Sequence, residues 1–147
     1  MITQEKNICI AVTTADCVPV LIYDPINHIL GTVHAGWKGT VQRIAAKTVL
    51  RMKQELHSEP SKLIVVIGPS ISQKMFEVGD EVGQSFIEEG FDLDSIAYRD
   101  KKTKKLHIDL WKANVEQLVE EGIDVSNIEI SGICTFQDDA FFSARRQ

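Results

Sequence analysis

A cysteine and a histidine in two short motifs are the residues of this chain best suited to chemistry. Cys17 closes a Thr-Ala-Asp-Cys segment, and His34 opens a His-Ala-Gly-Trp segment. Each motif lies at the end of an apolar run, and the Asp-Pro turn at residues 24–25 separates the two runs. A thiol and an imidazole at matching ends of neighbouring strands can converge on one point. Such a pair serves as a metal site or as a Cys–His nucleophile pair, and both interpretations stay open.

Length and composition bound the class of protein. The 147 residues fit one domain spanning 1–147, and 44% hydrophobic with 25% charged residues is ordinary for a globular protein. A formal net charge of -5 argues against a nucleic-acid partner. No apolar run approaches the roughly 20 residues that span a bilayer, and the N-terminus lacks the pattern of a signal peptide. We therefore expect no membrane partner, a cytoplasmic location, and three cysteines that are free thiols or metal ligands.

Apolar runs alternate with amphipathic stretches along the chain. Continuous apolar runs predict strands over residues 7–13, 18–23, 29–34, 63–67, 106–109 and 128–133. Three- and four-residue periodicity predicts helices over 40–57, 76–89 and 110–120. Residues 92–100 fit neither pattern, and the lysine-rich run at 101–105 predicts a solvated hairpin tip. Interleaved strands and helices predict an α/β layered domain, and the early hairpin predicts a mixed sheet.

Both ends look incomplete for a domain. The chain enters a predicted core strand almost at once, with no preceding element. Near the other end, Phe141 and Phe142 would be costly to expose without a partner. We therefore expect a missing part of the fold and self-association through the incomplete ends.

Residues beside the His-Ala-Gly-Trp segment suit an anion. Two glycines around the tryptophan allow close backbone approach, and the segment opens a predicted helix with free N–H groups. The phosphate-loop spacing is absent. Two arginines near the C-terminus suit a phosphate or carboxylate, unless they are simply a frayed terminal pair. The candidates for substrate or phosphate are Gly36, Lys38, Gly39, Thr40, Arg145 and Arg146.

The remaining polar residues are interpreted as structural. Glu77 and Asp80 resemble surface carboxylates of a helix, and Asp109 is most simply a helix N-cap. Cys134 is interpreted as a buried thiol, although it follows a strand and could approach the site. Cys17 also has a structural interpretation, because a free cysteine packs well as a small apolar side chain.

Several segments together resemble one family, the laccase-domain group (YfiH-like, described as multicopper polyphenol oxidases), over essentially the whole chain. The resemblance implies a three-layer α/β/α sandwich with a mixed β-sheet, related to cysteine-dependent toxin deamidases. It implies a metal site of two histidines and one cysteine, usually holding zinc, in which Cys17 and His34 are two of the ligands. The third ligand lies in an upstream Gln-x-His-Gly segment that this chain lacks. The matching segments are residues 14–21, 33–40, 68–71, 76–79, 109–111, 134–135 and 141–146.

The resemblance also implies an activity. Bacterial members are described as purine nucleoside phosphorylases with adenosine deaminase and methylthioadenosine phosphorylase activity, so the implied partners are purine nucleosides and phosphate. The family name also suggests copper-dependent phenol oxidation, but one cysteine and one histidine cannot assemble a multicopper centre. A Cys–His thiol hydrolase or deamidase remains possible on the residues alone, and so does an inactive fragment. The chain resembles the C-terminal part of a family member, with the N-terminal part of the fold missing.

Overall fold

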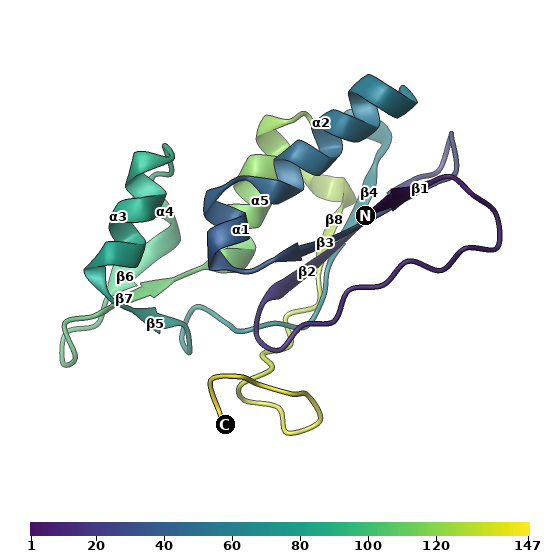
Figure 1. Cartoon of the computed structure of the whole chain (residues 1–147). Coiled ribbons are helices and arrows are strands. Elements are labelled where there is room, and N and C mark those ends of the chain that lie inside the picture. Colours follow the sequence, from purple (N-terminus) through teal and green to yellow (C-terminus); the bar gives the residue numbers. More distant parts are fainter.

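Two β-sheets of unequal size organise the chain, and the computed structural model describes all 147 residues (Figure 1). The larger sheet has five strands in the order β1-β3-β2-β4-β8, and the smaller has three in the order β5-β7-β6. The strands are β1 Ile2–Thr3, β2 Val18–Asp24, β3 Ile29–Ala35, β4 Ile64–Ile67, β5 Glu77–Val78, β6 Ala97–Arg99, β7 Leu106–Ile108 and β8 Ile128–Ile130. The α-helices are α1 Trp37–Val41, α2 Ile44–Leu56, α3 Asp80–Glu88, α4 Leu93–Ile96 and α5 Leu110–Glu120, and short 3-10 turns span Pro60–Lys62 and Val125–Asn127.

The larger sheet is mixed, as the sequence predicts. Strand β2 pairs antiparallel with both β3 and β4, whereas β4 pairs parallel with β8. The β2–β3 hairpin turns at Asp24, whose carboxylate accepts hydrogen bonds from the amides of Ile26 (2.9 Å) and Asn27 (3.0 Å). Burial alone would raise the pKa of Asp24, but the neighbouring Ser58 hydroxyl and hydrogen bonds from Asn27 and Ile26 outweigh it and lower that pKa.

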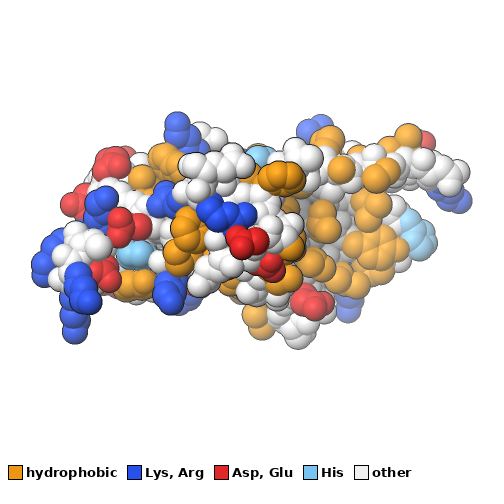
Figure 2. Space-filling model, turned by 90° about the horizontal axis from the view of Figure 1, so that it is seen from below, with side chains coloured by type: hydrophobic (Ala, Val, Ile, Leu, Met, Phe, Trp, Pro, Cys, Tyr) orange, Lys and Arg blue, Asp and Glu red, His pale blue; other side chains and the backbone are white.

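Helices cover one face of the larger sheet. Helices α1, α2 and α5 lie on that face, while the coil of residues 4–17 runs along the opposite side (Figure 1). The second face keeps apolar side chains in contact with solvent, including Leu21 (46% exposed), Leu30 (42%) and Ile64 (45%). Apolar side chains gather on this side of the molecule (Figure 2). The mixed α/β prediction is confirmed, and these 147 residues form a helical layer on one face only. None of the helices is both long enough and apolar enough to cross a membrane.

The predicted strand over residues 7–13 is wrong. This segment is coil, and Ile8 is 53% exposed. The edge position beside β3 is taken by β1, with Ile2 opposite Gly31 and Thr3 opposite Leu30. An apolar run forms a strand only where a partner strand accepts its backbone hydrogen bonds, and this run has none.

The first two predicted helices are shorter than their periodicity indicates. The stretch 40–57 divides into α1 and α2 because Arg43 adopts a left-handed conformation (φ 57°). The Arg43 guanidinium bonds to Glu120 of α5 and lies 4.5 Å from the centre of the Phe91 ring, so long-range contacts favour the break. Helix α3 begins only at Asp80, because residues 77–78 form β5. The predicted helix 110–120 is confirmed with its limits, and Asp109 caps it by accepting from the amide of Lys112 (2.9 Å).

A buried polar network joins the helices behind the site. Gln117 of α5 is fully buried, and its Oε1 accepts a hydrogen bond from the amide of Ala46 (3.1 Å) in the first turn of α2. Asn114, also fully buried, donates to the Thr40 hydroxyl (3.1 Å). Helix α2 has no cap from its own N-terminal residue, so α5 supplies one. This network fixes α1, which follows directly after β3.

Candidate functional site

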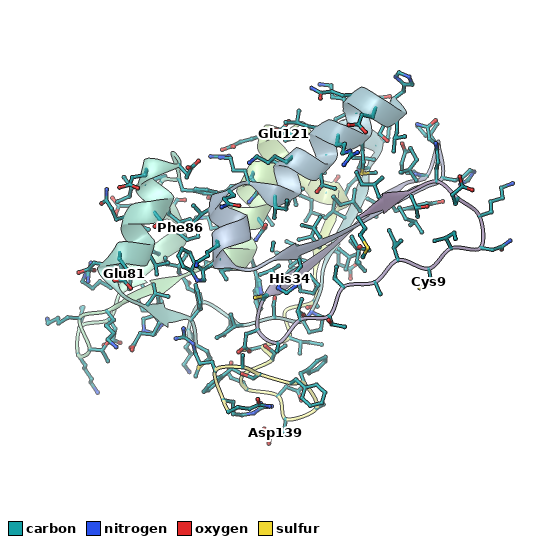
Figure 3. All side chains as sticks on the ribbon, viewed as in Figure 1. Cys9, His34, Glu81, Phe86, Glu121 and Asp139 are labelled. Atoms are coloured by element: carbon teal, nitrogen blue, oxygen red, sulfur yellow. The ribbon has the colours of Figure 1, made fainter.

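Cys17 and His34 lie at the same end of the β2–β3 hairpin. His34 is the cross-strand partner of Pro19, and Val18 is the partner of Ala35. Cys17 directly precedes β2, and its thiol lies close to Gly36, two positions after His34. His34 is exposed at the end of β3, whereas Cys9 lies well away from it on the N-terminal coil (Figure 3). The convergence of thiol and imidazole on one point stays a prediction.

Gly36 allows Cys17 to approach the start of α1. A Cβ atom added at Gly36 would fall 2.9 Å from Cys17 Sγ, closer than real Cβ contacts. The backbone of Gly36 is extended (φ -64°, ψ 170°), so the space rather than the conformation requires glycine here. The absence of a side chain at Gly36 therefore lets the Cys17 thiol pack against the end of β3.

Asp16 is the residue of this site that sequence reasoning missed. Its buried carboxylate accepts hydrogen bonds from Thr135 Oγ1 (2.8 Å), Ser143 Oγ (2.9 Å) and the backbone amide of Arg145 (2.8 Å). Its backbone is left-handed (φ 79°), and its carbonyl oxygen accepts from the amide of Ile71 (2.9 Å). Asp16 thus ties the C-terminal segment to the turn that carries Cys17. The donors to its carboxylate lie 119 to 129 positions away along the chain, so no local pattern reveals them.

The surroundings of Cys17 keep its thiol protonated when no cation is near. Burial raises the pKa of Cys17, and the negative charge of Asp16 raises it further. An unaided nucleophilic cysteine needs the opposite shift. A bound cation would favour the thiolate, so this environment suits a metal ligand better than a free nucleophile.

The predicted anion residues around α1 are placed differently from one another. Lys38 is exposed, with its ammonium 5.5 Å from the centre of the Trp37 ring. Thr40 is fully buried, and its hydroxyl donates to the carbonyl of Ala35 (3.4 Å). A Cβ added at Gly39 would fall 3.3 Å from Ile44, so this glycine serves the packing of α1 on α2. Of this group, Gly36 lies at the end of β3 and Lys38 faces solvent.

The two C-terminal arginines have different surroundings. The Arg146 guanidinium donates to the carbonyls of Thr135 (3.1 Å), Phe136 (3.0 Å), Asp138 and Phe141, so it holds the C-terminal loop together. The Arg145 guanidinium donates to the carbonyl of Glu77 and lies 5.3 Å from the centre of the Phe76 ring. It lines a cavity of about 280 Å³ together with Trp37, Lys105, Glu77 and Glu81. Arg145 is therefore the arginine that faces a cavity.

Other polar residues occupy structural positions. His107 is buried and stacks on Tyr98 with ring centres 4.9 Å apart, while its Nε2 lies 3.5 Å from a Glu77 oxygen. Cys134 is buried, and its Sγ accepts from the amide of Ser72 (3.3 Å). Burial would raise the pKa of Cys134, but hydrogen bonds from Ser72 and from the loop amides that follow outweigh it and lower that pKa.

Cys17 and His34 are the two metal ligands that the sequence predicts in this chain. A thiolate and an imidazole are the donors that zinc prefers. No group of three or more His, Cys, Asp or Glu side chains is arranged to hold a metal ion. Cys17 and His34 therefore fit zinc in their chemistry, but they do not by themselves complete the three protein ligands of a catalytic site.

The fold and site define a mixed α/β protein with a cysteine–histidine pair at one end of its large sheet. The family model described as "Multi-copper polyphenol oxidoreductase laccase" matches residues 1–147, and the chain belongs to this family. A "Purine nucleoside phosphorylase" of Bacteroides thetaiotaomicron is 46% identical over an alignment that covers 99% of this chain and 54% of that protein. An "Adenosine deaminase RL5" from an unknown prokaryotic organism is 42% identical over 99% of this chain and 56% of its own length. The chain thus spans about half the length of these curated relatives.

Solved structures share the fold. The YfiH protein of Bacillus licheniformis superposes with a TM-score of 0.85 at 36% identity, over 90% of this chain and 50% of that protein. YlmD of Geobacillus stearothermophilus gives a TM-score of 0.83 at 35% identity, with the same shares covered. These matches confirm the predicted family and the mixed α/β fold. They also agree with the prediction that the chain resembles part of a larger family member.

Proposed function

We propose that this chain carries the cysteine–histidine part of a purine nucleoside phosphorylase site, with adenosine deaminase and methylthioadenosine phosphorylase activity. The observation that supports this most directly is the placement of Cys17 and His34 at one end of the β2–β3 hairpin. The relatives named as purine nucleoside phosphorylase and adenosine deaminase are 46% and 42% identical over nearly the whole chain. Two chemistries on one nucleoside are consistent with one site that activates a small nucleophile, phosphate or water.

We propose zinc as the cofactor, with Cys17 and His34 as two of its ligands; the third protein ligand is either another histidine or a residue of another polypeptide. Zinc bound there would supply a Lewis acid that polarises an oxygen or activates water. Copper is the weaker candidate, because the donor pair lacks the several histidines of a multicopper centre. The chain's own residues shape the site: Gly36 admits the thiol, and Asp16 holds the turn before it.

Phosphate has a proposed place beside Trp37. Arg145 and Lys105 line the cavity there and can neutralise an anion, although Glu77 and Glu81 also line it. Glu77 is partly neutralised, since its carboxylate lies 3.4 Å from the Lys105 ammonium. We keep Gly36, Lys38 and Arg145 as phosphate candidates, and we assign Gly39, Thr40 and Arg146 to the structure around them.

Turnover assays test this proposal. The purified chain is supplied with zinc and assayed for deamination of adenosine, and for phosphorolysis of inosine and methylthioadenosine. We expect turnover that Cys17→Ser and His34→Ala abolish, while the matched variants Cys9→Ser and His57→Asn retain it. A folded, zinc-supplied chain without any turnover would contradict an activity of this chain alone.

A thiol hydrolase is the second chemical candidate, and alkylation separates it from the zinc site. Metal-bound Cys17 should resist iodoacetamide until a chelator removes zinc, with exposed Cys9 as the internal control. Rapid labelling of Cys17 at neutral pH, unaffected by zinc, would instead support the thiol enzyme.

The uncovered sheet face favours one further candidate function, a module that acts only together with another polypeptide. A cavity of about 330 Å³ lies on this face among Leu21, Tyr23, Leu30 and Ile64. Sizing of the purified chain across concentrations, with zinc content measured in each fraction, tests this candidate. A monomer at all concentrations that binds zinc and turns over nucleoside would exclude it.

A further inference from the structure

We propose that a purine base binds in an uncharged cavity between the C-terminal aromatic pair and the two prolines Pro19 and Pro69. This inference rests on the proposed nucleoside function and names the base subsite. The cavity measures about 280 Å³, and none of its eight lining residues is charged. Its walls include Val12, Pro19, Pro69, Ala140, Phe141 and Phe142.

The cavity adjoins the reactive pair through Pro19. Pro19 is the cross-strand partner of His34 and lies two positions after Cys17 in the sequence. Pro19 is held firmly, since its carbonyl accepts from the amide of Gly68 (2.9 Å) and a Cβ at Gly68 would fall 2.9 Å from the Pro19 ring. A base seated on Pro19 would place its sugar toward His34.

The aromatic wall offers a stacking surface. Phe142 is 79% exposed, which leaves its ring free to cover a flat ligand, whereas Phe141 is partly buried. The loop that carries both rings is anchored at each end. Arg146 bonds to the carbonyl of Phe141, and Asp16 accepts from the hydroxyls of Thr135 and Ser143. A free aromatic ring on an anchored loop, lining one cavity with two prolines, suits a neutral planar heterocycle.

The distribution of charge assigns the two cavities to different parts of a substrate. The cavity at Phe142 has no charged lining residue, whereas the cavity beside Trp37 is lined by the cations Arg145 and Lys105 and by the carboxylates Glu77 and Glu81. His34 pairs across the hairpin with Pro19, which lines the first cavity, and Trp37 lines the second. Gly36 lies between His34 and Trp37 in the sequence and is in close contact with the Cys17 thiol. Phosphorolysis of a nucleoside requires this order: base, sugar carbon under attack, then phosphate.

Binding of free adenine, which needs no catalysis, tests the subsite. The 147-residue chain is titrated with adenine by calorimetry, alongside Phe142→Leu, which removes the aromatic ring and keeps an apolar side chain, and Ala140→Phe, which fills the cavity. Tyr98→Leu is the matched control, because Tyr98 is an exposed aromatic residue of the smaller sheet. We expect about tenfold weaker adenine binding in Phe142→Leu, the loss expected for one stacked base, similar weakening in Ala140→Phe, and no change in Tyr98→Leu.

The outcomes separate the subsite from the proposed function. Equal adenine affinity in the parent chain and Phe142→Leu, equal weakening by Tyr98→Leu, or no adenine binding would each overturn the subsite. Adenosine turnover with an unchanged KM in Phe142→Leu would overturn the subsite while the enzymatic proposal stands. Ring-dependent adenine binding without any turnover would support the subsite and contradict the activity.

Discussion

Removing the Asp16 carboxylate is expected to destabilise the protein more than any single change among its partners. Asp16→Ala deletes an acceptor that is only 8% exposed and receives three hydrogen bonds. Two of the donors, the hydroxyls of Thr135 and Ser143, are 3% and 1% exposed as residues and would lose their acceptor in the interior. The Arg145 amide lies nearer to solvent and can bond to water instead.

The expected loss of stability follows from the two buried hydroxyls that would be left without an acceptor. Leaving a buried donor unsatisfied costs about 1–3 kcal/mol, and hydrogen bonds to a charged acceptor lie toward the upper part of that range. We therefore expect Asp16→Ala to lower the free energy of unfolding by about 3–5 kcal/mol. A chain of this length has about 7–15 kcal/mol in total, so the variant should still fold. At about 2–4 °C per kcal/mol, its Tm should fall by about 6–20 °C.

Urea unfolding followed by the fluorescence of Trp37 and Trp111 measures this change. Thr135→Val and Ser143→Ala each remove one donor and leave the carboxylate its other partners, so each should cost only about 1–1.5 kcal/mol. Asp139→Ala removes an exposed carboxylate of the same segment and should cost nothing measurable. If Asp16→Ala were no more damaging than Ser143→Ala, the carboxylate would not be the anchor of the C-terminal segment.

Three further perturbations test other parts of the structure. Gly36→Ala should displace the Cys17 thiol and change its iodoacetamide labelling rate severalfold in the metal-free chain; unchanged labelling would refute the tight contact. Asp24 has a lowered pKa in the fold, so its stabilisation is present above the unfolded value of about 3.9 and is lost as the pH falls through the folded value. Asp24→Asn should therefore flatten the fall in unfolding free energy between about pH 5 and pH 2, and a parallel curve would contradict this. Gln117→Leu should cost about 1–3 kcal/mol in urea unfolding by uncapping α2, whereas the exposed Gln137→Leu should be neutral; equal effects would refute the cap.

The β2–β3 hairpin was predictable because strand register is local. An apolar run, an Asp-Pro turn and a returning run fix this hairpin, and it brings the segments that carry Cys17 and His34 to the same end. The limits of α5 were predictable because their signals are also local. The N-cap Asp109 and the three- and four-residue spacing of apolar side chains lie within one segment. The anion candidates were predicted less well, because burial of Thr40 and capture of the Arg146 guanidinium by loop carbonyls depend on distant segments.

The sequence by itself determined the family and the hairpin and predicted the two candidate side chains, since these follow from contiguous motifs, turn chemistry and the two-residue period of a strand. Only the tertiary structure decided that residues 7–13 remain coil, that Arg43 breaks a helix, and that Asp16 holds the C-terminal segment against the Cys17 turn. Each of these depends on which distant groups accept a hydrogen bond or fill a space. The donors to the Asp16 carboxylate lie 119 to 129 residues away from it, and residues so far apart produce no periodic pattern in a sequence. These contacts are therefore seen only in the folded molecule.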